Sequence, residues 1–194
     1  MDRFQKMFRL TETTRVLDVG GSPEIWRLAV QPNLTMVNVP RALAADHSVP
    51  QVGADGCLLP FRDDAFDVVF SNSVIEYVGS VDDQRKFAAE VARVGRSFWV
   101  QTPNRGFPVE SHMLLPFVHQ LPERWRPAIV NRFTGWELLF RPTESQKQYY
   151  LHHFLHELRL LSASDLQSLF PNSEVIREKV FGLTKSLIAV RICA

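Results

Sequence analysis

Short apolar runs alternate with amphipathic segments along the first half of the chain. The run RVLDVGG at 15–21 is rich in aliphatic residues, as is typical of a strand covered on both faces. Ser22 can cap a following helix, Pro23 suits its first turn, and Pro32 stops it. The pattern therefore predicts a strand, a glycine turn and a helix of about two turns that ends near Val30.

The same alternation continues as far as residue 104. Further strands are predicted at 34–39, 51–54, 66–71 and 97–104, with a helix at 81–93 before Gly95. Strands that alternate with helices favour a parallel sheet with right-handed crossovers. In such sheets ligands bind at the carboxyl ends of the strands.

The remainder of the chain divides into two parts. The segment at about 105–160 is rich in proline and aromatic residues and breaks the alternation, so we expect an inserted lid. A helix at 162–170 follows, with Ser162 or Ser164 as its expected cap. The runs at 173–183 and 186–192 predict an antiparallel C-terminal hairpin with its connection at 182–185. We expect one domain over residues 1–194 that includes this lid.

Composition narrows the class of protein. The chain has 194 residues, is 45% hydrophobic and 22% charged, and carries a net charge of +1, so nothing indicates a nucleic-acid partner. No apolar run reaches the ~18 residues of a membrane span, and we expect no stable membrane insertion and a cytoplasmic location. Cys57 and Cys193 are too few and too far apart for a disulfide framework or a zinc site, and we expect each to be a small buried hydrophobe.

Asp18 raises the question of which ligand the glycine turn serves. It precedes the first glycine by two residues, where a carboxylate would repel the pyrophosphate of a dinucleotide. Two unit charges about 4 Å apart interact by roughly 4 kcal/mol at an effective dielectric constant near 20. The sign of that interaction favours a ligand with cationic groups, such as S-adenosylmethionine.

Two segments carry a resemblance to a known family. VLDVGGSPEIW at 16–26 resembles the first motif of class I S-adenosylmethionine-dependent methyltransferases. The segment 53–78 is similar to the second half of their cofactor site, as found in the type 11 group related to ubiquinone and menaquinone methyltransferases. The resemblance implies an α/β, Rossmann-like sheet of seven strands, mostly parallel with the last strand antiparallel, and helices on both faces. It implies S-adenosyl-L-methionine as cofactor and S-adenosyl-L-homocysteine as product.

The resemblance also assigns roles to residues. Asp18 would hold the methionine ammonium, while Gly20 and Gly21 would let the backbone approach the methionine moiety. Asp55 would accept from the adenine amino group, and backbone near Cys57 or Leu58 would meet the ring edge. The full set of expected cofactor contacts is Asp18, Gly20, Gly21, Asn38, Asp55, Gly56, Cys57, Ser71 and Asn72.

This chain departs from the family pattern at two of the positions near the cofactor. Ser22 stands where the family usually has another glycine. Asn38 replaces the acidic residue that grips the ribose hydroxyls. Asparagine can still accept one hydroxyl hydrogen bond and donate another, without the assistance of a charge. The substitutions are also compatible with a catalytically silent module that binds S-adenosylmethionine or a partner.

The catalytic residues are less well indicated than the cofactor contacts. Glu110 and His112 follow the strand at 97–104, and either could act as a general base; both could instead hold an irregular loop by hydrogen bonds. His152 and His156 are spaced as on one helical face, but no third ligand is evident, and we expect no metal site.

The sequence does not identify the molecule that would accept the methyl group. The family fold carries methylation of small molecules, lipids and sugars, and the apolar stretch of the lid could line an acceptor pocket or cover the cofactor. It could also form a homodimer contact or touch a membrane, which its prolines make the last choice. A third and weaker hypothesis for the glycine turn is that the protein is a nicotinamide-dependent reductase.

Overall fold

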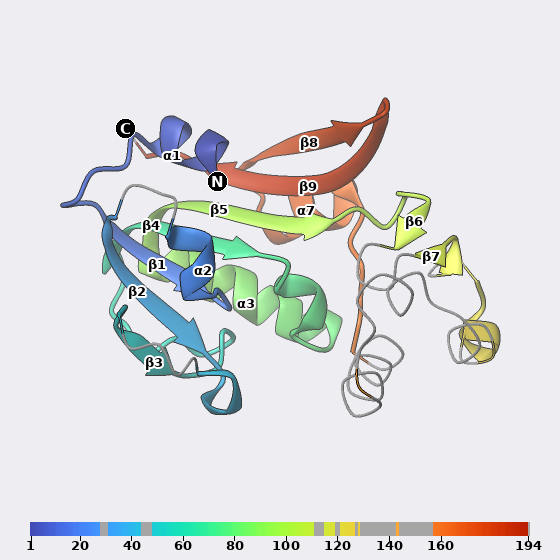
Figure 1. Cartoon of the computed structure of the whole chain (residues 1–194), viewed down its shortest axis with the longest axis horizontal. Coiled ribbons are helices and arrows are strands. Elements are labelled where there is room, and N and C mark those ends of the chain that lie inside the picture. The colour runs from blue at the N-terminus through green and yellow to red at the C-terminus, as the bar shows by residue number, and fades with distance from the viewer. Residues whose placement is uncertain are drawn as a thin grey trace.

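The computed structural model describes residues 1–27, 31–43, 48–110, 115–118, 121–126, 128, 143 and 157–193. Seven strands form one sheet in the order β3-β2-β1-β4-β5-β9-β8, as Figure 1 shows. The strands are β1 (Arg15–Val19), β2 (Asn33–Asn38), β3 (Gln51–Gly53), β4 (Phe66–Asn72), β5 (Gly95–Pro103), β8 (Glu174–Val180) and β9 (Leu183–Arg191).

Strand direction confirms the predicted mixed sheet. β1, β2, β3, β4 and β5 pair in parallel, whereas β9 pairs antiparallel with both β5 and β8. The carboxyl ends of the parallel strands therefore share one edge of the sheet, where α/β folds bind ligands. The hairpin turn between β8 and β9 lies at that same edge, because Pro103 at the end of β5 pairs with Ser186 near the start of β9.

Two helices cover one face of the sheet. α3 (Val81–Val94) begins with a capping box between Ser80 and Asp83 and buries Phe87 and Val91 at helical spacing. α7 (Ala163–Leu169) begins with the same device at Ser162, one of the two serines expected as its cap. Both helices contribute to the apolar cluster that includes Leu17 and Val19 of β1.

The opposite face is covered by α1 (Asp2–Phe8) and α2 (Pro23–Trp26). Phe4 of α1, Trp26 of α2, Phe70 of β4 and Trp99 of β5 form an aromatic cluster with edge-to-face and tilted contacts, ring centroids being 4.7–6.1 Å apart. The sequence did not predict α1. Phe4 and Phe8 are four residues apart, as on one face of a helix. Two apolar positions are too few, however, to distinguish a helix from an irregular N-terminal segment by pattern alone.

The short helices complete the described fold. Single 3₁₀ turns occur at η1 (Pro40–Ala42), η2 (Ile75–Tyr77) and η4 (Glu123–Trp125).

Within the predicted lid, β6 (Val109–Glu110) pairs antiparallel with β7 (Leu115–Pro116). Most of the lid expected at 105–160 lies outside the described residues, as does the predicted end of the first helix at 28–30.

Candidate functional site

The carboxylate of Asp18 in β1 is buried beneath the turn that follows this strand. Its side chain has no exposed surface, although most buried carboxylates are paired with a cation. The indole Nε1 of Trp26 donates to its Oδ2 at 2.7 Å. Its Oδ1 has no hydrogen-bond partner among the residues that the structure describes. One carboxylate oxygen is thus fixed and the other is left for a donor that the described chain does not supply.

Burial raises the pKa of Asp18 to about 7, and the Trp26 hydrogen bond opposes this rise. The carboxylate is therefore close to half ionised at neutral pH. A cation placed at its Oδ1 would favour the ionised form and would lower this pKa again. This carboxylate is therefore electrostatically suited to a cationic group.

The glycine turn leaves no room for side chains above this carboxylate. Gly20 has φ of +78°, and its N–H donates to the carbonyl of Val37 at 2.7 Å. A Cβ atom at Gly20 would overlap the side chain of Val74, and one at Gly21 would overlap the carboxylate of Asp18. The backbone of Gly21 therefore lies directly against Asp18, and a side chain at Gly21 would displace this carboxylate.

Asn38 joins the end of β2 to the glycine turn. Its Nδ2 donates to the carbonyl of Gly21 at 3.0 Å, and the residue is half-buried. One donor of the amide is thereby used inside the protein. The amide oxygen remains as the acceptor that a ribose hydroxyl would need. Ser22 is half-buried, and its hydroxyl donates to Glu24 rather than capping α2 with its side chain.

The second motif forms a tight turn at Asp55. The exposed carboxylate accepts from the backbone N–H of Cys57 at 2.8 Å, and the Leu58 N–H donates to the Asp55 carbonyl at 3.0 Å. A Cβ at Gly56 would lie 2.9 Å from ring atoms of Phe87, so the turn packs closely on α3. One oxygen of the Asp55 carboxylate thus stabilises the turn, and its second oxygen is exposed.

Arg93 of α3 holds the continuation of this turn in place. Its guanidinium donates to the carbonyls of Leu59 and Phe61 at 3.1 and 2.7 Å. Glu90 pairs with Arg93 and also accepts from the Leu59 N–H at 2.7 Å, which keeps the pKa of Glu90 below its usual value. The loop after β3 is therefore anchored at its far end while Asp55 stays accessible.

Ser71 and Asn72 at the end of β4 complete the predicted cofactor set. Ser71 is buried, and its hydroxyl donates to the Val19 carbonyl at 3.0 Å, which joins β4 to the end of β1. Asn72 is half-buried, and its Oδ1 lies 3.5 Å from the Ser73 hydroxyl. Both residues lie at the edge where Asp18 and Asn38 end their strands.

The predicted catalytic residues cannot be compared with the structure in the same way. His112 lies outside the described residues, and Glu110 is described only by its backbone in β6. All six histidines also lie outside them. In the described ranges no group of three or more histidine, cysteine or acidic side chains could hold a metal. The Cys57 thiol has a pKa raised to about 11 by burial and neighbouring carboxylates, so it is protonated at neutral pH.

Three residues near the site were missed by the sequence analysis. Trp26 fixes Asp18, and Val74 closes against Gly20. Glu76 is a buried carboxylate that accepts from the Thr102 hydroxyl at 3.0 Å on the side of β5. Trp26 follows Asp18 by eight residues across a strand-turn-helix unit. With this spacing the helix packs back on the sheet, so that Trp26 comes to lie beside Asp18.

The comparisons with known proteins agree with this geometry. Residues 27–97 match the family model described as a methyltransferase domain. The match covers the strands that carry Asn38 and Ser71 and the turn at Asp55, and it begins after Asp18. The seven-stranded sheet with its reversed β9 is the Rossmann-like architecture that the resemblance implied. The match over part of the chain and the order of the sheet make this chain similar to the class I S-adenosylmethionine-dependent methyltransferases. The ubiquinone-like subgroup stays a prediction. A search of curated sequences finds no match for this chain.

Solved structures share the methyltransferase fold at low identity. An S-adenosylmethionine-dependent methyltransferase of Methanosarcina mazei has 10% identity and a TM-score of 0.54, with 98% of each chain covered. Phosphoethanolamine N-methyltransferase 2 of Haemonchus contortus, solved with S-adenosyl-L-methionine, has 16% identity and a TM-score of 0.56, covering 90% of this chain and 37% of that one.

A protein of Rhodobacter sphaeroides named as a zinc-dependent alcohol dehydrogenase has 13% identity and a TM-score of 0.64, covering 98% of this chain and 88% of that one. These likenesses establish the fold, and the chemistry has to be argued from the site. Among the residues that the structure describes, no helix is long and apolar enough to span a membrane.

Proposed function

We propose that the chain binds S-adenosyl-L-methionine at the carboxyl ends of β1, β2 and β4 and transfers its methyl group to a small or medium-sized acceptor. The observation that carries this proposal is the buried Asp18 carboxylate, whose Oδ1 has no partner among the described residues and lies against the Gly21 backbone. An anionic phosphate placed there would add repulsion to a desolvated charge. The ammonium of the methionine moiety would remove that cost.

The other described residues fit the rest of the cofactor. Asn38 offers its amide oxygen to the ribose, and the free oxygen of Asp55 suits the adenine amino group. Gly56 and Cys57 contribute the backbone of the adenine turn, and Gly20 and Gly21 the backbone of the methionine turn. Asn72 supports the methionine end, whereas the Ser71 hydroxyl already donates within the sheet.

When bound, the cofactor supplies a methyl group attached to a positively charged sulfur, ready for in-line displacement. The chain contributes binding, orientation and exclusion of water, which can supply much of the rate for such a reaction. The acceptor would enter beside the end of β5, where Asn104 precedes the β6–β7 segment. Glu110 and His112 are proposed as bases for an acceptor that must lose a proton. The acceptor class is a small molecule, a lipid or a sugar.

Titration calorimetry with S-adenosylmethionine, S-adenosylhomocysteine and NADH tests the cofactor directly. We expect heat from the first two ligands and none from NADH, because the dinucleotide carries a pyrophosphate. Transfer from a tritiated methyl donor to fractions of a cell extract then tests activity. Binding without transfer to any fraction would favour the catalytically silent module that Ser22 and Asn38 leave open, and binding of NADH alone would overturn the proposal.

Substituting Asp55 by asparagine should weaken S-adenosylhomocysteine binding about fivefold, close to 1 kcal/mol. Asparagine can keep the turn bond to the Cys57 N–H but then presents a donor to the adenine amino group. The inosine analogue, which has a carbonyl in place of that amino group, serves as a control ligand. Calorimetry should show the wild type discriminating against the analogue and the variant losing this discrimination; equal losses for both ligands would contradict the adenine contact.

A further inference from the structure

The turn between β8 and β9 has an unusual composition. Val180 pairs with Leu183, so Phe181 and Gly182 form a two-residue turn with φ of +49° and +81°. Positive φ at both positions is the pattern of a type I′ turn, which favours Asn-Gly. Phe181 is instead fully exposed, and Val180 and Leu183 beside it are also exposed. Phe181 therefore serves neither the turn nor the core.

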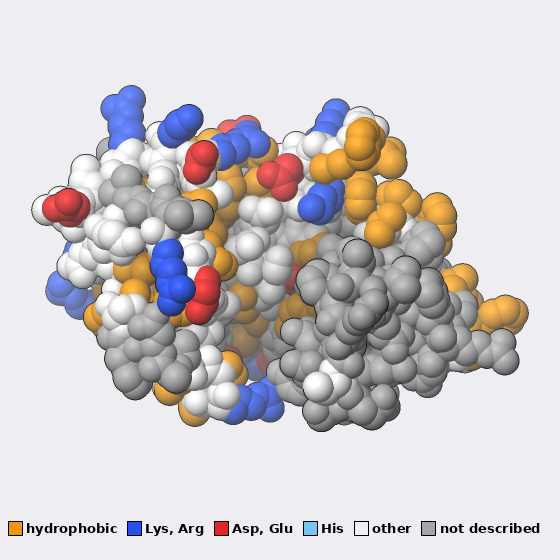
Figure 2. All heavy atoms as spheres, in the orientation of Figure 1, with side chains coloured by type: hydrophobic (Ala, Val, Ile, Leu, Met, Phe, Trp, Pro, Cys, Tyr) orange, Lys and Arg blue, Asp and Glu red, His pale blue; other side chains and the backbone are white. Residues whose placement is uncertain are grey.

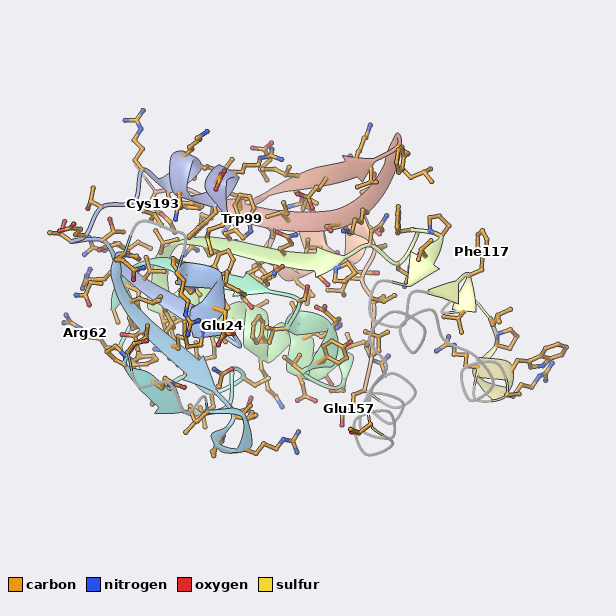
Figure 3. The ribbon with its side chains drawn as sticks, viewed as in Figure 1. Glu24, Arg62, Trp99, Phe117, Glu157 and Cys193 are labelled. Atoms are coloured by element: carbon orange, nitrogen blue, oxygen red, sulfur yellow. The ribbon has the colours of Figure 1, made fainter. Side chains whose placement is uncertain are left out.

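Other exposed apolar residues continue from this turn. Val109 of β6 and Phe117 after β7 are exposed, and Figure 2 shows hydrophobic side chains gathered at the hairpin turn and over β6 and β7. In Figure 3 the side chain of Phe117 points away from the β6–β7 pair. We call this surface the apolar rim and define it as Val109, Phe117, Val180, Phe181 and Leu183.

The apolar rim lies at the ligand edge of the sheet. The side chain of Asn104, directly after β5, donates to the Thr184 carbonyl at 2.8 Å, and its backbone N–H donates to the Lys185 carbonyl at 2.9 Å. These bonds tie the hairpin turn to the strand end from which the β6–β7 segment continues. The rim consequently borders the side on which an acceptor would enter.

The charges beside the hairpin turn are positive. Lys179 directly precedes the four residues of the turn, Lys185 follows them by two residues, and both lysines are exposed. The neighbouring acidic residue, Glu178, is half-buried, and its carboxylate accepts from the Gln101 amide at 3.4 Å over the sheet. The rim thus combines exposed aliphatic and aromatic groups with lysines, the combination that suits the interface of an anionic bilayer.

We propose that the apolar rim docks reversibly on an anionic lipid bilayer. Phe181 and Leu183 would enter the headgroup region while Lys179 and Lys185 contact lipid phosphates. A symmetric contact between two copies would instead bring the same lysines together, which their charges oppose. The orientation would turn the ligand edge toward the membrane. Docking needs no cofactor, so it stands or fails separately from the proposed methyl transfer.

Vesicle flotation of the full chain without cofactor tests this docking. The probes are phosphatidylcholine vesicles and vesicles that contain about 30% phosphatidylglycerol. We expect at least fivefold more bound protein on the anionic vesicles and loss of that excess at about 0.5 M salt, where charges are screened within a few Å. Equal binding to both vesicles, or binding to neither, would overturn the proposal.

Phe181→Asn is the decisive variant, because asparagine suits the turn and should not lower the melting temperature. We expect it to reduce the fraction bound to anionic vesicles at least fivefold, and K179E/K185E to do the same. Ile192→Asn is the matched control, since Ile192 is 56% exposed beyond the opposite end of β9. Unchanged binding of Phe181→Asn refutes the docking surface. A wild-type dimer that this substitution dissociates, without vesicle binding, assigns the rim to a second copy instead.

Discussion

Replacing Asp18 by asparagine should weaken S-adenosylmethionine binding at least tenfold, equivalent to about 1.4 kcal/mol. The neutral amide can still accept from Trp26, but it cannot attract the ammonium group, and its own N–H would face that group. Titration calorimetry at pH 8 measures the loss. An unchanged dissociation constant would contradict the role assigned to Asp18.

The same substitution should make the unliganded protein more stable. Asp18 has a pKa of about 7 when folded and an ordinary value of 3.8, so its stabilising contribution is complete below pH 4 and is lost as the pH rises through 7. At pH 8 the folded protein therefore holds a buried charge that the variant lacks. We expect a gain of about 2 kcal/mol in the free energy of unfolding at pH 8 and a smaller gain at pH 5.

Asp67→Asn is the matched control. Asp67 lies at the start of β4, away from the ligand edge, and Arg15 contacts its Oδ1 at 2.6 Å. That pairing keeps the pKa of Asp67 below its usual value, so its contribution to stability is present at neutral pH and is lost as the pH falls. The control should lose about 1 kcal/mol of stability at pH 8 and leave cofactor binding unchanged.

Trp26→Phe should shift the pH dependence of cofactor binding upward. The wild type is expected to bind about tenfold less tightly at pH 6 than at pH 8, because binding to a cation requires ionised Asp18 and its pKa is about 7. Phenylalanine can keep contacts with Phe4 and Phe70 but removes the hydrogen bond that lowers this pKa. Affinity measured by calorimetry between pH 6 and 9 should therefore reach its plateau at a higher pH.

Trp99→Phe separates this effect from a general loosening of the aromatic cluster. Trp99 is buried beside Phe4, and its Nε1 has no hydrogen-bond partner among the described residues. The substitution removes a similar ring volume without touching Asp18. Both variants should lose stability, by about 1–2 kcal/mol for Trp26→Phe and less for Trp99→Phe. Identical pH profiles of binding in the two variants would argue against positioning by Trp26.

Much of the fold could be predicted from the sequence because its signals are local. Ser80 and Ser162 each start a helix with a capping box, and valine-rich runs mark the inner strands. The hairpin was predicted with its connection at 182–185, whereas the observed turn consists of Phe181 and Gly182. The apolar Phe181 at a position with positive φ gives no turn signal of its own.

The site could be predicted only as far as its motifs reach. The roles of Asp18, the two glycines and Asp55 follow from the family resemblance of those motifs and stay predictions. The Trp26 hydrogen bond depends on how α2 packs on the sheet, and the Ser71 bond to Val19 depends on strand pairing, so neither follows from a motif. Cys193 was expected to be a small buried hydrophobe and is exposed, because β9 ends two residues before it.

The reversed direction of β9 also determines where the carboxyl end of the chain emerges. Arg191 pairs with Phe98 near the start of β5, so the final residues leave the sheet at the margin opposite Asp18 and Asn38. A fluorophore or an immobilising group attached there would stay clear of bound nucleoside and of any vesicle at the hairpin. One tethered preparation can therefore report on both surfaces without obstructing either.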